Sequence, residues 1–331
     1  MQSISIVLCT FNGDRFLDAQ IKSLREQEGV AEIVVVDDAS MDGTLSIIQS
    51  HAVQDSRIRL FRNSGSLGVA QNFERAIGLA TCPWIALSDQ DDVWLPEKIS
   101  RLRKAWDGKS CLMHHATHKF RGTVPDSLPF PARQRRKFSG SDLRRLLYRN
   151  SVVGHTTLVR ADVVRRLMPF PADLPYDWWI GAGTATLGEV QYVDEYLVHY
   201  RIHDRNAYHP GGSRLKRLRS EHGFRVGIME ALLELGTLPV SQLLFVEDYL
   251  HLLGRSQKGF CLVLWRFYLT HAALFFGGVG TRISRFTAVR KSFGATLAST
   301  FKIFGEDVPT APAMRSLPSR IMVDKPLEKV G

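Results

Sequence analysis

The feature that most constrains the fold is a regular alternation of short apolar segments and helical patterns through the first hundred residues. The segments 5–9 and 32–37 are almost wholly apolar, as strands buried on both faces of a parallel sheet are. Between them, residues 14–27 repeat leucine and isoleucine at helical spacing. Repeated strand–helix units of this kind predict a parallel sheet with helices on both faces.

The same alternation lets us assign expected elements along most of the chain. In the first part we expect helices over 43–51 and 68–80, strands over 57–61 and 84–87, and a helix opened by Pro96. In the second part we expect a loop across 120–150 that ends in a leucine-bearing helix, strands over 156–160, 190–192 and 197–201, a helix from Asp177, and helical patterning over 214–300.

Polar segments follow three of the expected strands. TFNGD (10–14) follows the first, DDASMDGT (37–44) the second, and SDQDD (88–92) the fourth. Ligands of open parallel sheets bind beyond the carboxyl ends of the strands, so these segments should meet at one site. The chain contains neither GxGxxG after the first strand nor GxxxxGK[ST]. This favours a nucleotide site built on carboxylates and a metal over a glycine-rich phosphate cradle.

The segment 88–92 indicates a cation site. Asp89 and Asp91 flank Gln90 on a turn after a strand, where two carboxylates can hold one divalent ion and leave positions open for phosphate oxygens. Hard oxygen ligands favour Mg²⁺ or Mn²⁺ over Zn²⁺. The alternative is a solvated acidic turn, with Asp92 as an acid near the start of the helix at Pro96.

Charge is unevenly distributed over the chain. The net charge is +10, yet residues 1–100 carry 8 Lys+Arg against 14 Asp+Glu. The basic remainder indicates either an anionic partner or a solvated basic surface. The basic runs at 133–137 and 214–219 have few aromatic neighbours, so we expect no specific nucleic acid and favour an anionic membrane surface.

Two further features concern the compartment. The four cysteines show neither a CxxC pair nor zinc spacing, and the N-terminus lacks signal-peptide features, so we expect a cytoplasmic protein with free thiols. The apolar run 259–280 contains Arg266 and His271. It suits an amphipathic helix on the bilayer surface or a buried core helix better than a spanning helix. We therefore expect a cytoplasmic protein that could be peripheral on the membrane.

A set of motifs occurs in one order across residues 3–206. They are SIVLCTFNGDRFLDAQIKSL, IVVVDDASMDGT, GVAQNFERAI, ALSDQDDVWLPEKI, SVVGHTTLVR, YDWWIG and YRIHDRN. In this set the chain resembles the family 2 inverting glycosyltransferases of the GT-A fold, particularly the bacterial rhamnosyltransferase-like members. The resemblance implies an α/β, Rossmann-like fold with a mixed sheet flanked by helices. Residues 207–331 lie outside the motifs, and a helical C-terminal extension is expected over 211–305.

The resemblance also implies roles for individual residues in binding the donor. Thr10, Phe11 and Asn12 resemble the base-binding segment, Asp38 resembles the acid that bonds the base or ribose, and Asn72 and Asp89 resemble further nucleotide-sugar contacts. Asp91 resembles the metal-bound acid and His203 a late ligand to the metal, Mn²⁺ or Mg²⁺, or to the diphosphate. Arg201 lies two residues from His203 on the same strand face and could touch the diphosphate.

Asp177 resembles the catalytic base of the family. It stands before Trp178 and Trp179, whose indoles could desolvate the carboxylate and raise its pKa, although a helix N-terminal acid is the alternative. Either indole could stack on a sugar or pack in the core, and the core is the stronger expectation for at least one. Tyr176 stands where relatives often carry His, and His155 where a small or sulfur residue is common. Both departures lie on the expected acceptor side.

The expected reaction moves a sugar, such as rhamnose or another hexose, from a UDP- or dTDP-sugar to a hydroxyl of a glycan or lipid-linked acceptor in surface polysaccharide biosynthesis. A metal would neutralise the leaving diphosphate, and inversion would need one general base. Two alternatives stay open: a non-catalytic membrane- or polyanion-binding protein on the same fold, and a sugar nucleotidyltransferase. The latter needs a phosphate-binding loop that TFNGD does not supply.

These expectations divide the chain into three parts. Residues 1–210 should form the glycosyltransferase domain, with a nucleotide-binding half (1–107) and an acceptor-binding half (108–210). Residues 211–305 should form a basic helical region that could associate with the membrane. The proline-containing tail 306–331 should be flexible.

Overall fold

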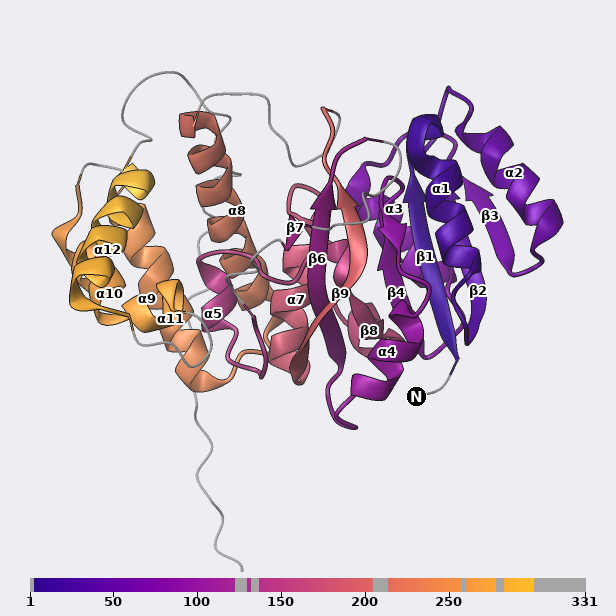
Figure 1. Ribbon diagram of the computed structural model, residues 1–331. Helices are drawn as coiled ribbons and strands as arrows, with labels where there is room; N and C mark the ends of the chain where they lie inside the picture. Colours follow the sequence, from indigo (N-terminus) through magenta and orange to yellow (C-terminus); the bar gives the residue numbers. More distant parts are fainter. Residues whose placement is uncertain are drawn as a thin grey trace, which may run out of the picture.

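The computed structural model describes residues 3–122, 130–131, 137–204, 214–256, 260–277 and 283–300 (Figure 1). The strands of this part of the chain form one mixed sheet in the order β3-β2-β1-β4-β8-β6-β9-β5, with β7 beside β6. Their bounds are β1 Ile4–Thr10, β2 Val30–Asp37, β3 Ile58–Arg62, β4 Trp84–Ser88, β5 Val93–Trp94, β6 Leu112–Phe120, β7 Phe130–Pro131, β8 Leu158–Arg160 and β9 Val190–Arg201.

The helices fall between the strands in the first half and gather after β9 in the second. Those within the sheet region are α1 Asp14–Arg25, α2 Thr44–Gln54, α3 Val69–Leu79, α4 Lys98–Ala105, α5 Arg144–Leu147, the 3-10 turn η1 Gly154–Thr156, α6 Ala161–Arg165 and α7 Tyr176–Leu187. Those after the sheet are α8 Arg214–Leu235, α9 Val240–Ser256, α10 Leu262–Thr270, α11 Ala272–Phe276 and α12 Arg285–Thr300.

The first four strands in the sheet order are all parallel, as the strand–helix alternation predicts. β1 pairs with β2 and β4, and β2 pairs with β3, each in parallel. Alternate residues of a strand point to opposite faces. Ile6 and Leu8 of β1 therefore pack on the face covered by α1, α2 and α4, whereas Val7 packs on the face covered by α3 and α7. The apolar strands are consequently buried on both sides.

The second half of the sheet mixes directions. β8 is antiparallel to β4 and β6, β5 is antiparallel to β9, and β6 is parallel to β9. The expectation of two strands over 190–192 and 197–201 was wrong, because both belong to the single strand β9. Asp194 and Glu195 interrupt the apolar pattern there but are not buried, so the strand continues through them. The predicted mixed sheet flanked by helices is confirmed.

The helices after residue 213 pack at the end of the molecule opposite β3 (Figure 1). The apolar run 259–280 supplies two short helices, α10 and α11, and its side chains Leu264, Tyr268 and Phe275 are buried in the core. Within the described residues, no helix is both long enough and apolar enough to cross a bilayer. The loop expected across 120–150 lies partly, and the tail 306–331 wholly, outside the described residues. The helix expected at the end of that loop is α5.

Candidate active site

The polar segments that follow β1, β2 and β4 meet at one edge of the sheet, because these strands are parallel and in register. Thr10 at the end of β1 donates from its hydroxyl to Asp37 at the end of β2, at 3.0 Å. Asn12 and Ala39, just past these two strands, have left-handed backbone with φ of 46° and 63°. The chain thus turns sharply at the carboxyl ends, where a ligand of such a sheet binds.

Gln90 holds the turn after β1. Its side-chain oxygen accepts from the Phe11 amide at 2.8 Å, and its side-chain nitrogen donates to the Phe11 carbonyl at 3.0 Å. A Cβ at Gly13 would lie 2.3 Å from the same Gln90 oxygen, so glycine is required for this close approach. The Phe11 ring is left 48% exposed. Phe11 is therefore the predicted base-binding residue that presents an exposed aromatic ring.

Asp38 and Asn72 are bonded within the protein. The Asp38 carboxylate accepts from Asn63, the Ser66 hydroxyl and the Leu67 and Gly68 amides at 2.6–3.0 Å, and the bonds to this loop hold its pKa below the usual value against the effect of burial. The Asn72 amide donates to the Val36 carbonyl. Asp38 thereby fixes the loop before α3, and Asn72 ties α3 to β2.

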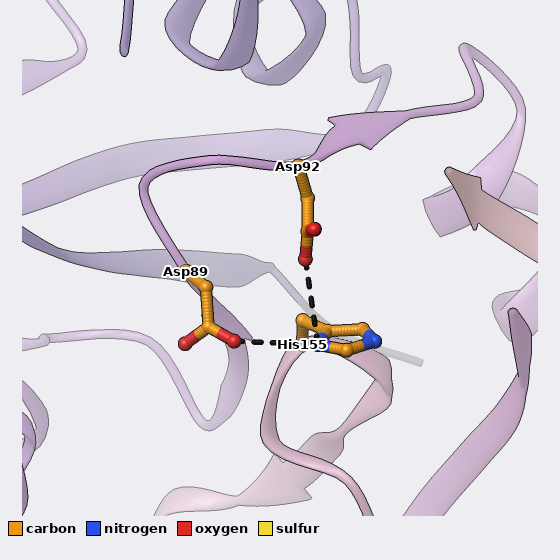
Figure 2. Close-up of side chains that lie close together, drawn as sticks. All are labelled: Asp89, Asp92 and His155. Carbon is orange, nitrogen blue, oxygen red and sulfur yellow. Dashed lines mark hydrogen bonds and ion pairs between the residues drawn. The ribbon is translucent and has the colours of Figure 1, made fainter. Parts of the chain in front are cut away.

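Asp89 and Asp92, which follow β4, and His155 of η1 form a largely buried cluster of charged groups. His155 Nδ1 lies 3.3 Å from Asp89 Oδ2 and 3.4 Å from Asp92 Oδ2, as Figure 2 shows. Asp92 and the His155 ring are closed off from solvent, whereas about a third of the Asp89 side chain is exposed. The His155 ring stacks on Tyr200, with 4.8 Å between centroids. Asp92, which could have been a helix N-terminal acid, instead braces the site from behind.

Burial and neighbouring charges shift the pKa values within this cluster. Burial raises the pKa of Asp92 to about 7, although His155 opposes the shift. Burial alone would lower the pKa of His155, but Asp92 and Asp89 together raise it above its ordinary value. The two carboxylates thus favour the protonated imidazole, whose Nδ1 lies at hydrogen-bonding distance from the partly exposed Asp89.

Asp91 and His203 meet on the more accessible side of the same turn. His203 Nε2 and Asp91 Oδ2 are 2.7 Å apart, and their side chains keep 11% and 16% exposure. Burial and then Asp89 raise the pKa of Asp91, because a second negative charge nearby disfavours ionisation. The structure thus brings the two predicted metal ligands into direct contact, although they are 112 positions apart.

Arg201 is fully buried behind this pair. Its guanidinium lies between the rings of Phe16 and Phe120, 4.4 Å from each centroid, and Nε donates to the Asp91 carbonyl at 2.7 Å. Its backbone amide donates to Asp92 Oδ1 at 3.0 Å. We predicted that Arg201 touches a diphosphate. In the structure these contacts join Arg201 to the acidic turn.

Asp177 lies in the first turn of α7, facing η1. Its two oxygens accept from the Trp178 amide at 2.7 Å and the Gly154 amide at 3.3 Å. Burial, and then the charge of Asp89, raise the pKa of Asp177 to about 6. The Asp177 side chain is partly buried. Its neighbour in sequence, Tyr176, reaches the acidic cluster, because the Tyr176 hydroxyl donates to Asp89 Oδ1 at 3.2 Å.

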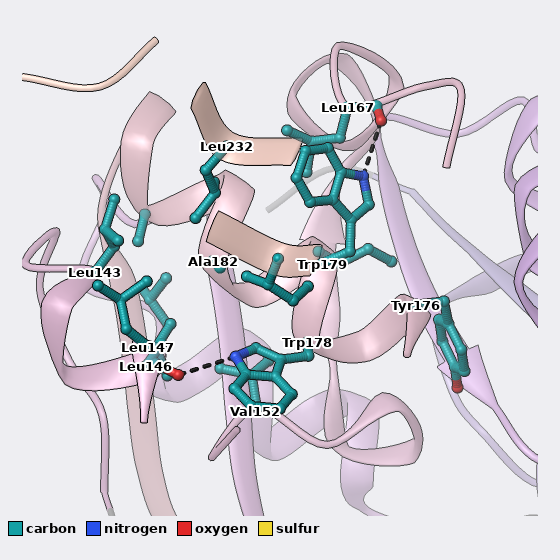
Figure 3. Close-up of a cluster of buried hydrophobic side chains, with 14 of the residues drawn as sticks. Leu143, Leu146, Leu147, Val152, Leu167, Tyr176, Trp178, Trp179, Ala182 and Leu232 are labelled. Atoms are coloured by element: carbon teal, nitrogen blue, oxygen red, sulfur yellow. Dashed lines mark hydrogen bonds between the residues drawn. The ribbon is translucent and has the colours of Figure 1, made fainter. Parts of the chain in front are cut away.

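Both tryptophans after Asp177 pack in the core (Figure 3). Trp178 Nε1 donates to the Leu146 carbonyl and Trp179 Nε1 to the Leu167 carbonyl, each at 2.9 Å. Their exposures are 5% and 3%. We expected at least one of the two rings to pack in the core, and both do. The aromatic side chain of this segment that reaches the site is Tyr176.

The donor atoms of this edge suit a divalent cation. Asp89, Asp92 and His155 each offer a ligand atom, and these atoms lie within 4.8 Å of one another. Asp91 and His203 offer a second carboxylate–imidazole pair. Carboxylate oxygen with imidazole nitrogen suits Mn²⁺ or Mg²⁺ in combination with phosphate oxygens.

Lys98 is a part of the site that the sequence did not reveal. It is fully buried, its ammonium donates to the His155 carbonyl at 2.7 Å, and it lies 3.3 Å from the Trp94 ring centroid. Burial lowers its pKa well below the usual value, while Asp92 and Asp89 oppose the shift. A lysine in an amphipathic helix ordinarily faces solvent, so periodicity gave no signal for it.

Two proteins of known sequence are similar to part of this chain. A protein of Haemophilus influenzae described as an uncharacterized glycosyltransferase is 26% identical over 212 residues, which are 60% of this chain and 65% of that protein. Succinoglycan biosynthesis protein ExoO of Rhizobium meliloti is 33% identical over 147 residues, 43% of this chain and 39% of that protein. The chain therefore spans slightly less than two thirds of the first relative.

Two solved structures share the architecture. TarS 1-349 of S. aureus, in complex with UDP-GlcNAc, superposes with a TM-score of 0.57 at 15% identity and covers 91% of this chain and 82% of its own. The mannosyltransferase PcManGT of Pyrobaculum calidifontis, in complex with GDP-Man and Mn²⁺, has a TM-score of 0.57 at 18% identity and covers 91% and 86%. At these identities the similarity establishes the fold.

The sheet order, the helices on both faces and these neighbours define a GT-A fold, which confirms the expectation from sequence. Residues 5–168 match the model of the family described as Glycosyl transferase family 2. This part of the chain is therefore similar to the family 2 glycosyltransferases.

Proposed function

We propose that the protein is a metal-dependent, inverting glycosyltransferase. The observation that carries the proposal is that two features meet at one edge of the sheet: an acidic turn whose ligand atoms could hold a cation, and a carboxylate with a pKa of about 6. The acidic turn suits the binding of a nucleoside diphosphate, and the carboxylate suits a general base. A single displacement by an acceptor hydroxyl needs both groups.

Asp177 is the proposed base. A carboxyl whose pKa is about 6 is ionised at neutral pH yet is a stronger base than an ordinary carboxylate. The Gly154 and Trp178 amides fix its two oxygens, and Tyr176 ties the same turn of α7 to Asp89. Asp177 would accept the proton of the acceptor hydroxyl, while Asp89 orients the donor on the other side.

Asp91 and His203 are the proposed ligands of Mn²⁺ or Mg²⁺, because they are the more exposed carboxylate–imidazole pair, whereas Asp92 and His155 are closed off from solvent and lie 3.4 Å apart as an ion pair. When bound, the cation neutralises charge on the leaving diphosphate. Asp89, held by His155 and Tyr176, would face the ribose and sugar.

The donor and acceptor are proposed on chemical grounds and on relatives. We assign a UDP- or dTDP-sugar, with rhamnose or another hexose as the transferred group, and Phe11 as the aromatic face for the base. TarS, of the same fold, is seen with UDP-GlcNAc, and a sequence relative bears the name of a polysaccharide biosynthesis protein. A glycan or lipid-linked acceptor in surface polysaccharide synthesis fits, at the cytoplasmic face of the membrane.

The first test is calorimetric titration of UDP, dTDP and GDP, each with Mn²⁺ and with chelator. We expect metal-dependent binding of UDP or dTDP, weakened at least about tenfold in Asp91→Ala, since one charged ligand is lost. Asp162→Ala removes an exposed acid that pairs with Arg160, and should leave binding unchanged. Absence of nucleotide binding by the folded wild-type chain would refute the proposal.

A further inference from the structure

Helix α12 presents its larger apolar side chains to solvent. Phe286, Val289 and Phe293 recur at helical spacing, and their exposures are 78%, 44% and 47%. The opposite side of the helix, which packs on the molecule, carries small or hydroxyl side chains: Ala288, Ser292, Ala295, Thr296 and Ser299 are buried. A surface helix normally places its apolar residues toward the core, so this arrangement calls for a partner on the outer side.

The start of α10 extends the same surface. Phe260 lies beside Phe293, with 5.4 Å between ring centroids, and it is 46% exposed. Leu262 and Val263 follow it at 58% and 48% exposure, and α10 packs against α12. We call these six side chains the α10–α12 face: Phe260, Leu262, Val263, Phe286, Val289 and Phe293.

The charged residues of α10 and α12 themselves have one sign. Residues 260–300 contain no aspartate or glutamate. Arg266, Arg285, Arg290 and Lys291 belong to α10 and α12, and all four are exposed. Helices that combine an exposed apolar side with exclusively basic charged residues resemble those that lie in the headgroup region of anionic bilayers.

The position of the two helices suits such a role. α10 and α12 lie at the outer end of the molecule, on the far side of the C-terminal helices from the sheet (Figure 1). A surface bound there would leave the carboxyl edge of the sheet free for donor and acceptor. A second copy of the chain is a poorer occupant, because two basic faces would repel each other.

We propose that the α10–α12 face docks the protein on an anionic phospholipid bilayer. This deepens the proposed function, because it supplies the surface that would bring the active-site edge to a lipid-linked acceptor. It differs from the expectation that the apolar run 259–280 makes the contact. Most large side chains of that run are in the core, and half of the exposed face comes from α12.

The test is co-sedimentation of the full chain with vesicles of phosphatidylcholine containing 30 mol% phosphatidylglycerol, about the anionic fraction that recruits basic amphipathic helices, and with pure phosphatidylcholine. Three variants are compared: the apolar pair Phe286→Ser with Phe293→Ser, the basic pair Arg285→Gln with Arg290→Gln, and the control Val53→Ser. Val53 is 90% exposed on α2, at the other end of the molecule. UDP titration of each variant reports the nucleotide site separately.

We expect wild type and Val53→Ser to bind anionic vesicles and to bind pure phosphatidylcholine much less. The apolar pair should lose at least about tenfold in partitioning, because each buried aromatic side chain contributes at least that factor. The basic pair should weaken anionic binding and flatten its salt dependence. Failure of wild type to bind, or equal binding by all variants, would overturn the proposal. So would a lipid-free dimer that the apolar pair converts to monomer, since a second copy would then cover the face.

Discussion

The carboxyl edge of the sheet and the α10–α12 face depart from ordinary patterning in opposite ways. At the edge, ionisable groups are buried: Asp92, Lys98 and His155 have almost no exposure. On α12, aromatic side chains that would normally be buried are exposed. Each arrangement is unfavourable on its own, so each points to something that the fold positions these groups to meet.

The two regions differ in what holds them. The buried groups at the edge are locked by charge-assisted bonds to one another and to backbone, as Asp92 is by the Arg201 amide. Of the exposed aromatic residues, Phe260 and Phe293 lie beside each other, and roughly half or more of each ring-bearing residue remains exposed. Substitutions at the edge should therefore alter chemistry or stability, whereas substitutions on α12 should alter association alone. Three predictions test this contrast.

The largest expected effect is that of Asp177→Asn. Loss of a general base should lower kcat by about 10²–10⁴-fold, with donor binding retained. The free energy of unfolding should be unchanged or higher at neutral pH. A raised carboxyl pKa means that the folded state binds the proton more tightly, so ionisation lowers stability as pH rises toward about 6, and Asn does not ionise. Single-turnover transfer and urea unfolding measure the two.

The pH profile of the wild type serves as the control for this assignment. Transfer needs ionised Asp177, so kcat/KM should fall about tenfold per unit below a pH of about 6. Residual transfer by Asp177→Asn should lack that limb. If Asp177→Asn keeps the wild-type rate and the same fall of kcat/KM at low pH, Asp177 is not the general base.

An intermediate effect is expected for Gly154→Ala. A Cβ there would lie 2.0 Å from the Tyr176 hydroxyl, and that ring cannot move freely because it stacks on Phe73 at 4.0 Å. Overpacking of this kind costs about 1–3 kcal/mol of unfolding free energy, measured by urea titration. Adding Tyr176→Phe removes the nearest clashing atom and should restore part of the loss. Equal stability of Gly154→Ala and wild type would show that η1 and α7 are not tightly packed.

The smallest effect is expected for the α12 pair Phe286→Ser with Phe293→Ser. Exposed substitutions change stability by about 0.5 kcal/mol or less, so the urea midpoint of the lipid-free chain should hardly move. A loss above about 2 kcal/mol would show that these rings are covered in the fold, and the contrast between the two regions would disappear.

The sequence by itself determined the parts that depend on local pattern. Strand–helix periodicity placed β1 to β4 and their helices, because buried parallel strands are continuously apolar. It also brought the acidic turn to the carboxyl edge, since parallel strands end together. The motif set implied the GT-A fold, and it implied roles at one site for Asp91, as the metal-bound acid, and for His203, as a ligand to the metal or the diphosphate. The side chains of these two residues are in contact in the structure.

Only the tertiary structure decided which polar groups are buried and which apolar ones are not. Burial is a property of contacts between segments far apart in the chain: Lys98 meets the carbonyl of His155, and Asp92 meets the amide of Arg201. β9 likewise continues past Asp194 because β6 pairs with the residues on both sides of it, Val193 and Tyr196. The outward side of α12 follows from packing its small residues on α10, a choice that helical spacing alone leaves open because both sides carry a continuous stripe.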